Sequence, residues 1–169
     1  MLNFIRQGSV APLFLVHGLG GSCRSWTTLL SRLSQVRDLV AINLPGHGDS
    51  PLDANSDTFL GLADRVEAFL TDQDLLEIDV VGSSVWARIA LELARRGKVG
   101  ATIALDPGGF WRGWERTYFQ TTLTASIWLV RALGSMLPTP SRSTISRSML
   151  LAQVSARPWR LDDGVATTE

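Results

Sequence analysis

The fold of this chain is decided by residues 78–88, Ile78-Asp79-Val80-Val81-Gly82-Ser83-Ser84-Val85-Trp86-Ala87-Arg88. The first residues of this stretch are rich in β-branched side chains, which favour a strand. Apolar residues at helical spacing follow the Gly-Ser-Ser without a gap. A strand that turns sharply into a helix pushes the residue at the corner clear of the sheet, and with Gly82 two positions before it that residue is Ser84.

Trp86 departs from this pattern. A corner of this kind takes small residues two positions before and two positions after the serine, because the strand and the helix approach closely there. Gly82 satisfies the first requirement and Ala87 is also small, but Trp86 occupies the second position. We expect the indole to displace the start of the helix or to turn into a cleft, and overpacking of this kind predicts that Trp86→Gly stabilises the fold.

The composition of the 169 residues fits one soluble domain with a substantial core. The formal net charge is zero and no basic run exceeds two residues, so neither nucleic acid nor a membrane surface is an expected partner. Cys23 is the only cysteine, which excludes a disulfide framework and a cysteine metal site within one chain. The apolar stretch 119–137 is interrupted by polar residues, and no signal peptide is visible. We expect a cytoplasmic protein with no cofactor and no metal.

Strand and helix patterns alternate as far as Pro107. The predicted strands are an edge strand at 2–6, then 13–16, 39–44, the strand before Ser84, and 101–105. The first predicted helix starts near Ser22 or Ser25, the second covers 58–70, and the third runs from the corner to Arg96. This order predicts an α/β fold with a doubly wound, mostly parallel sheet. After Pro107 only helices are predicted, at about 117–136 and 141–154.

Three motifs stand in a fixed order: His17-Gly18-Leu19-Gly20-Gly21, Pro45-Gly46-His47-Gly48-Asp49-Ser50 and Gly82-Ser83-Ser84. Together they resemble the α/β-hydrolase fold superfamily, in particular its esterase, haloperoxidase-like and C–C hydrolase branch. The resemblance covers residues 2–107, and the helical remainder resembles the family's cap. It implies a hydrolase core at 1–107 and a helical cap region at 108–169, with the C-terminal core segment absent.

The resemblance implies a serine hydrolase that acts on a small ester or related carbonyl compound. Ser84 is the implied nucleophile, which forms an acyl-enzyme. The backbone N–H groups of Val85 and Leu19 are the implied oxyanion donors. Gly18 and Gly20 lack a Cβ, so the backbone can bend close to a reacting group there.

The resemblance also shows what is missing. In the family, histidines in the positions of His17 and His47 support loops, and the catalytic histidine follows the last strand, which lies beyond Glu169 here. Asp106 is a candidate acid, with the alternative that it caps the loop before Pro107. A serine without a base is a weak nucleophile, so the chain is expected to be inactive or crippled.

Aromatic side chains after Gly108 are the remaining candidates for binding substrate, together with Gly18, Gly20 and Trp86. They are Trp111, Trp114, Phe119 and Trp128, with Met136 beside them. The alternative for each is packing of the cap on the core.

Two other functions stay open at this point. One is a truncated, non-catalytic pseudoenzyme that binds a small apolar ligand or a partner protein, which the missing histidine favours. The other is a nucleotide-binding domain, which Cys23 disfavours because it occupies the place of a phosphate-loop glycine. In any of these, the strand 101–105 becomes an exposed sheet edge, so we expect self-association, completion by another chain, or aggregation.

Overall fold

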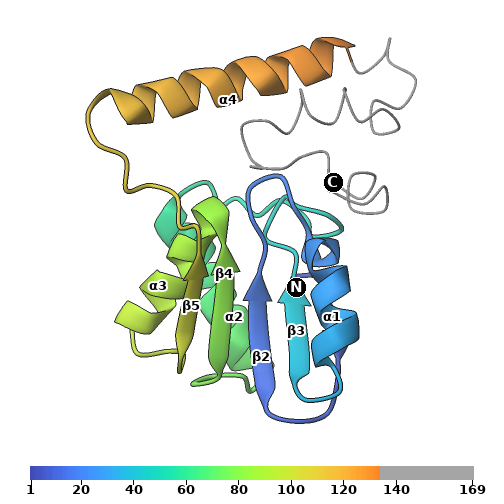
Figure 1. Ribbon diagram of the computed structural model, residues 1–169. Coiled ribbons are helices and arrows are strands. Elements are labelled where there is room, and N and C mark those ends of the chain that lie inside the picture. Colours follow the sequence, from blue (N-terminus) through green and yellow to red (C-terminus); the bar gives the residue numbers. More distant parts are fainter. Residues whose placement is uncertain (134–169) are drawn as a thin grey trace. The chain divides into compact units, whose positions relative to one another are not determined.

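The computed structural model describes residues 1–133 (Figure 1). The chain divides into two compact units, Met1–Gly109 and Phe110–Glu169. The first unit holds the sheet and three helices, and the described part of the second is helix α4 (Trp114–Leu133) with the loop before it. The division lies close to the predicted boundary after residue 107, while the roles of the two parts as core and cap stay a prediction.

Five strands form one sheet in the order β1-β3-β2-β4-β5. They are β1 (Phe4–Gln7), β2 (Pro12–Val16), β3 (Asp38–Ile42), β4 (Asp79–Ser83) and β5 (Thr102–Leu105). β1 runs antiparallel to β3 at one edge, and all other neighbours are parallel. The predicted α/β fold with a mostly parallel sheet is therefore confirmed, and the parallel strands all end at the same edge.

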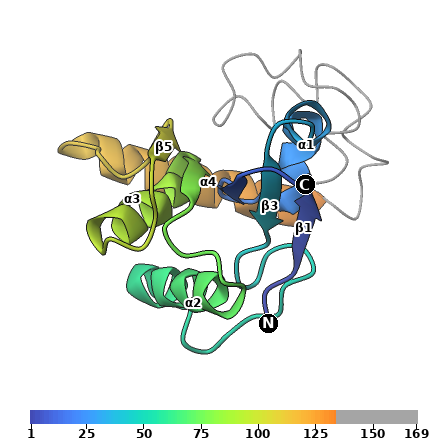
Figure 2. The same ribbon diagram turned by 90° about the horizontal axis from the view of Figure 1, so that it is seen from below.

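Helices cover both faces of the sheet, as Figure 2 shows. They are α2 (Phe59–Asp72) and α3 (Ala87–Arg95) on one face, and the 3-10 turn η1 (Cys23–Trp26) with α1 (Thr27–Leu33) on the other. Val80 of β4 belongs to the core cluster beneath α2 and α3, and the next residue, Val81, belongs to the cluster beneath α1. This alternation buries the parallel sheet from both sides, which is the doubly wound arrangement.

Two helices begin with a 3-10 turn that the apolar pattern does not reveal. Ser22 caps η1, since its hydroxyl accepts the N–H of Arg24 at 3.2 Å, and α1 proper starts only at Thr27. The turn η2 (Ser84–Trp86) likewise precedes α3. The predicted cap at Ser22 is thus confirmed, and the helix after the corner starts three residues later than the pattern suggests.

Helix α4 starts at Trp114, earlier than the predicted start at 117, because Glu115 accepts the backbone N–H of Arg112 at 2.9 Å and so supports its first turn. The predicted helix at 141–154 and Met136 lie outside the described residues. Among residues 1–133, no helix combines the length and the apolar character that a bilayer crossing requires.

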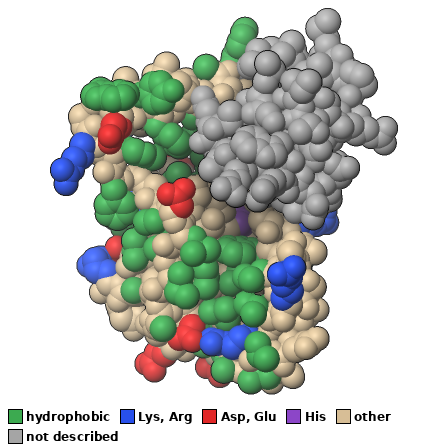
Figure 3. All heavy atoms as spheres, in the orientation of Figure 1, with side chains coloured by type: hydrophobic (Ala, Val, Ile, Leu, Met, Phe, Trp, Pro, Cys, Tyr) green, Lys and Arg blue, Asp and Glu red, His purple; other side chains and the backbone are tan. Residues whose placement is uncertain are grey.

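Strand β5 forms an open edge of the sheet within the described part of the chain. It pairs with β4 on one side, and its burial alternates along the strand. Ile103 and Leu105 are 54% and 45% exposed on the face opposite α3. Hydrophobic side chains gather on the face of the sheet that Figure 3 presents. An edge strand with unpaired backbone groups and exposed apolar side chains can pair with another chain.

We therefore expect the double variant Ile103→Lys/Leu105→Lys to associate less than the native chain. Lysines on an edge strand oppose pairing with a second chain, because their charges must be desolvated there. Light scattering over a concentration series should show the native chain as a dimer or larger species and the variant shifted toward the monomer. Leu52→Lys, at a leucine that is 84% exposed elsewhere, is the matched control. A native chain that stays monomeric at high concentration would contradict the expectation.

Candidate active site

Ser84 stands at the corner between β4 and α3 with a left-handed backbone, at φ +56°. Residues other than glycine rarely adopt such a φ, and holding one there costs about 1–3 kcal/mol. The strand register pairs Ser83 with Leu105, so Ser84 follows immediately at the carboxyl edge of the sheet. Its side chain is neither fully buried nor fully exposed. The backbone thus has the sharp, strained form that the sequence predicts for this corner.

The close approach of α3 to β4 depends on Gly82. A Cβ at this position would lie 2.7 Å from the Cα of Ala87 and 3.1 Å from the Cβ of Ala90. The first of these distances is shorter than real side chains tolerate, and both neighbours belong to α3. The interpretation of Gly82 and Ala87 as the small residues of the corner is therefore supported by their contact.

The loop after β2 lies against the serine. A Cβ on Gly18 would lie 3.1 Å from the Cβ of Ser84, and the N–H of Gly21 donates to the carbonyl of Gly18 at 3.1 Å. The structure thus brings Gly18 to Ser84. Leu19 follows Gly18, and Gly20 faces open space at φ +74°. That the N–H groups of Leu19 and Val85 bind an oxyanion stays a prediction.

His17 is fully buried, and both of its ring nitrogens bind backbone groups. The N–H of Leu44 donates to Nε2 at 3.1 Å, so the proton is on Nδ1, which lies 2.7 Å from the carbonyl oxygen of Gly18. Burial lowers the pKa of His17 from 6.5 to about 4, although the bond to Gly18 opposes this shift. The expected structural role is confirmed. The neutral ring links the loops after β2 and β3 by hydrogen bonds, and both of its nitrogens are engaged by backbone rather than by Ser84.

His47 sits in the turn after β3. Its Nδ1 lies 3.1 Å from the carbonyl oxygen of Pro45, and its ring centroid is 5.0 Å from that of His17. The N–H of Ser50 donates to the carbonyl of His47 at 3.0 Å. These contacts agree with the expected role of His47 in shaping its turn.

Trp86 packs half-buried against the core cluster beneath α2 and α3. Its ring is perpendicular to that of His47, with centroids 6.1 Å apart. The expected displacement of the helix is observed, since α3 begins after the turn η2. The indole also packs on the core cluster, a contribution that the corner motif does not predict, while the overpacking itself stays a prediction. Its Nε1 is buried and has no hydrogen-bond partner in the described part of the chain.

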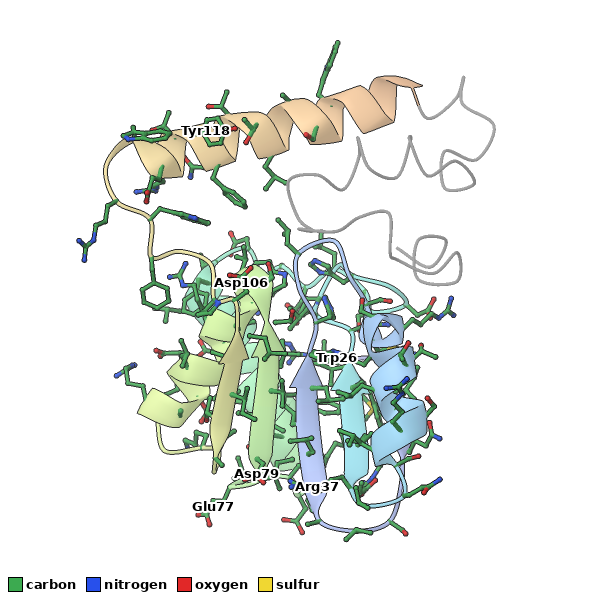
Figure 4. All side chains as sticks on the ribbon, in the orientation of Figure 1. Trp26, Arg37, Glu77, Asp79, Asp106 and Tyr118 are labelled. Atoms are coloured by element: carbon green, nitrogen blue, oxygen red, sulfur yellow. The ribbon has the colours of Figure 1, made fainter. Side chains whose placement is uncertain are left out.

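Asp106 follows β5 directly, as Figure 4 shows. Because Ser83 and Leu105 are paired, Asp106 and Ser84 occupy neighbouring positions at the end of two adjacent parallel strands. Asp106 is exposed and has φ +47°, a second left-handed residue beside the first. At this position the carboxylate lies at the strand end beside the serine and directly before Pro107.

The remaining predicted residues belong to the second unit. Trp111 stacks on Phe119 with ring centroids 4.5 Å apart, and Trp114 meets Tyr118 edge-on at 5.9 Å. Trp128 is 70% exposed and lines a shallow surface pocket along α4 with Gln120, Thr121, Thr124 and Ala125. Their part in substrate binding stays a prediction.

Two supporting residues have no signal in the sequence pattern. The side chain of Asn43 accepts the N–H of Cys23 at 2.6 Å and donates to that of Asn3 at 3.0 Å, which fixes the start of η1. Gly108 donates its N–H to the carbonyl of Ser84 at 3.2 Å. Within residues 1–133, no group of histidine, cysteine and acidic side chains is arranged to hold a metal ion.

The buried His17 predicts an acid-sensitive fold. Because its pKa is lower in the folded chain, the unfolded chain binds more protons between pH 6.5 and about 4. The contribution of His17 to the free energy of unfolding is therefore largest above pH 6.5 and falls by about 2 kcal/mol on acidification to about pH 4.5. Chemical denaturation across this interval should show a larger loss in the native chain and in His47→Gln than in His17→Gln, whose remaining loss comes from carboxylates that basic side chains hold at a lowered pKa, Glu67, Asp79 and Glu92. An equal slope in all three chains would refute this.

The packing of Trp86 reverses the expectation for its removal. Trp86→Gly should lower the free energy of unfolding by about 2 kcal/mol, because a half-buried ring leaves the core. Trp86→Phe keeps most of this packing and removes the unpaired Nε1–H, so it should leave stability unchanged or raise it. Thermal unfolding of both variants checks this, and a glycine variant that melts at or above the native temperature would restore the overpacking interpretation.

Comparison with known proteins agrees with this geometry. A sequence profile of the alpha/beta hydrolase family matches residues 13–166. An abhydrolase domain-containing protein of Schizosaccharomyces pombe is 28% identical over 85% of this chain and 56% of its own length. The dihydrolipoyllysine-residue acetyltransferase component of the acetoin cleaving system of Pseudomonas putida is 32% identical over 49% of this chain and 22% of its own length. The chain thus spans between about a fifth and just over half of these curated relatives.

Solved structures show the same fold. A marine microorganism esterase superposes with a TM-score of 0.65 at 25% identity, over 92% of this chain and 59% of its own. A thermophilic esterase from Thermogutta terrifontis superposes with a TM-score of 0.65 at 20% identity, over 99% of this chain and 65% of its own. The three motifs, the corner at Ser84 and the family profile agree, and the chain belongs to the alpha/beta hydrolase family.

Proposed function

We propose that this chain carries the acylation site of a serine hydrolase that acts on small esters or related carbonyl compounds. The observation that carries the proposal is the left-handed Ser84, with the glycine loop lying against it through Gly18. In the first step the Ser84 Oγ attacks the carbonyl carbon and the carbonyl oxygen becomes negative. The N–H groups of Leu19 and Val85 donate to this oxygen, and losing one such donor costs about 10²–10³ in rate. The alcohol then leaves, and water hydrolyses the acyl-enzyme.

The proton of Ser84 must pass to a base, and the chain has only two histidines. His17 has both nitrogens bound to backbone, and His47 has its Nδ1 next to Pro45. We infer that the catalytic histidine lies outside these 169 residues and that the chain alone reacts slowly. Asp106, next to Ser84 at the strand ends, is the acid that we propose for orienting such a base.

The relatives support an ester or related substrate. The marine microorganism protein at 25% identity is named an esterase, and this chain covers 59% of it. We propose that Gly18, Gly20 and Trp86 in the first unit contact the substrate. The single cysteine supports a reducing compartment such as the cytoplasm.

Because backbone groups occupy both ring nitrogens of His17, a second candidate function is also favoured. A hydrolase fold that keeps its nucleophile corner while its buried histidine binds backbone through both nitrogens fits a pseudoenzyme, which binds a small apolar ligand or a partner protein without turning it over. Reactivity of Ser84 distinguishes the two functions.

The test is labelling with a fluorophosphonate probe, followed by peptide mapping, and hydrolysis of a short-chain nitrophenyl ester. A serine hydrolase site should be labelled at Ser84, and Ser84→Ala should abolish both labelling and hydrolysis. The neighbouring Ser83→Ala is the matched control, since it removes a hydroxyl from the strand end and leaves the corner serine in place. Because the chain alone reacts slowly, labelling and hydrolysis are followed over a long exposure, and a Ser84 that stays unlabelled and inactive throughout rejects the enzyme and supports the pseudoenzyme.

A further inference from the structure

The carbonyl of Ser84 accepts two backbone hydrogen bonds. One comes from the N–H of Ala87, which closes the turn η2, and the other comes from the N–H of Gly108 at 3.2 Å. Ala87 is three residues away in the chain, whereas Gly108 belongs to the loop after the neighbouring strand β5. The loop after β5 is thus bonded directly to the corner that holds the serine.

The Ser84 carbonyl and the Val85 N–H belong to one peptide group. A trans peptide group is planar and rigid, so its C=O and N–H point in opposite directions. Holding the carbonyl of Ser84 therefore fixes the direction in which the N–H of Val85 points. We propose that Gly108 is a positioning residue, whose N–H sets the orientation of the Val85 oxyanion donor through the shared peptide plane. This inference rests on the proposed serine hydrolase function.

A side chain at position 108 would crowd Val85. A Cβ at this position would lie 3.0 Å from the Cγ2 of Val85, 3.2 Å from its Cα and 3.5 Å from its nitrogen. Every one of these atoms belongs to the proposed donor residue. A side chain at 108 would therefore push on the same peptide group that the hydrogen bond holds.

The next residue anchors the loop on helix α3. Gly109 has φ +101°, and a Cβ there would lie 2.9 Å from the Cδ of Arg88. The guanidinium carbon of Arg88 in turn lies 4.6 Å from the centroid of the Phe59 ring at the start of α2. The loop thus rests on a side chain that is itself held by a cation–π contact. This support limits how far the loop can retreat from Val85.

Gly108→Ala tests the proposal, with Gly100→Ala as the matched control. A Cβ on Gly100 would lie 2.8 Å from the carbonyl oxygen of Glu77, so this variant also forces a residue against backbone. It does so at the other end of the sheet from Asp106, where Figure 4 labels Glu77 and Asp79. Both variants therefore introduce a steric clash, and they differ in how far that clash lies from the corner at Ser84.

Two measurements are made on each chain: the rate of fluorophosphonate labelling at Ser84, and the ¹H–¹⁵N resonance of the Val85 amide. Gly108→Ala should slow labelling about tenfold to hundredfold and should shift the Val85 resonance. This reduction in rate is no larger than the one expected for the loss of one oxyanion donor. Gly100→Ala should leave both as in the native chain. Equal labelling rates in the two variants, with an unmoved Val85 resonance, would overturn the proposal.

The two measurements test the proposed function and the role of Gly108 separately. If no chain is labelled, the serine hydrolase function fails, and the Val85 resonance alone decides whether Gly108 orients the peptide group. If Gly108→Ala does not fold, a backbone ester at 108, in which glycolic acid replaces glycine, removes the N–H without adding a side chain. This ester should shift the Val85 resonance in the same way, and an unshifted resonance would refute the role of the hydrogen bond.

Discussion

The close contact between β4 and the start of α3 is the constraint on which the site depends. Gly82 lets the backbone of Ala87 approach to a distance that no side chain would allow, and the turn between them places Ser84 in the left-handed region. The strain of that residue is held by the packing of α3 on the sheet, whose helix residues belong to the same core cluster as Val80. Packing far from the serine thus maintains its unusual backbone.

The loops at the carboxyl edge of the sheet are joined to one another by hydrogen bonds. His17 connects the loop after β2 to the loop after β3, and Asn43 connects that second loop to the start of η1. Gly108 connects the loop after β5 to the corner. Each connection ends on backbone. These hydrogen bonds link the loops to one another at the edge where Ser84 lies.

Much of the fold and part of the site follow from the sequence, because they depend on local patterns. The buried strands, the cap at Ser22 and the corner at Ser84 are visible in apolar spacing and in the positions of small residues. The packing of Trp86 on the core cannot be predicted from the sequence. A strand-to-helix motif indicates only that space at the corner is limited, and it does not identify the core residues that lie beside the indole. The bond from Gly108 to Ser84 joins residues that are distant in the chain, and only the strand register brings them together.

The left-handed backbone at Ser84 lowers the stability of the fold at the residue that carries the proposed nucleophile. Glycine adopts this φ without strain, so exchanging the serine for glycine would relieve about 1 kcal/mol or more of torsional energy. Selection for folding alone would therefore favour glycine at this position. The serine lowers the stability of the scaffold, and the proposed reaction at its hydroxyl accounts for that loss.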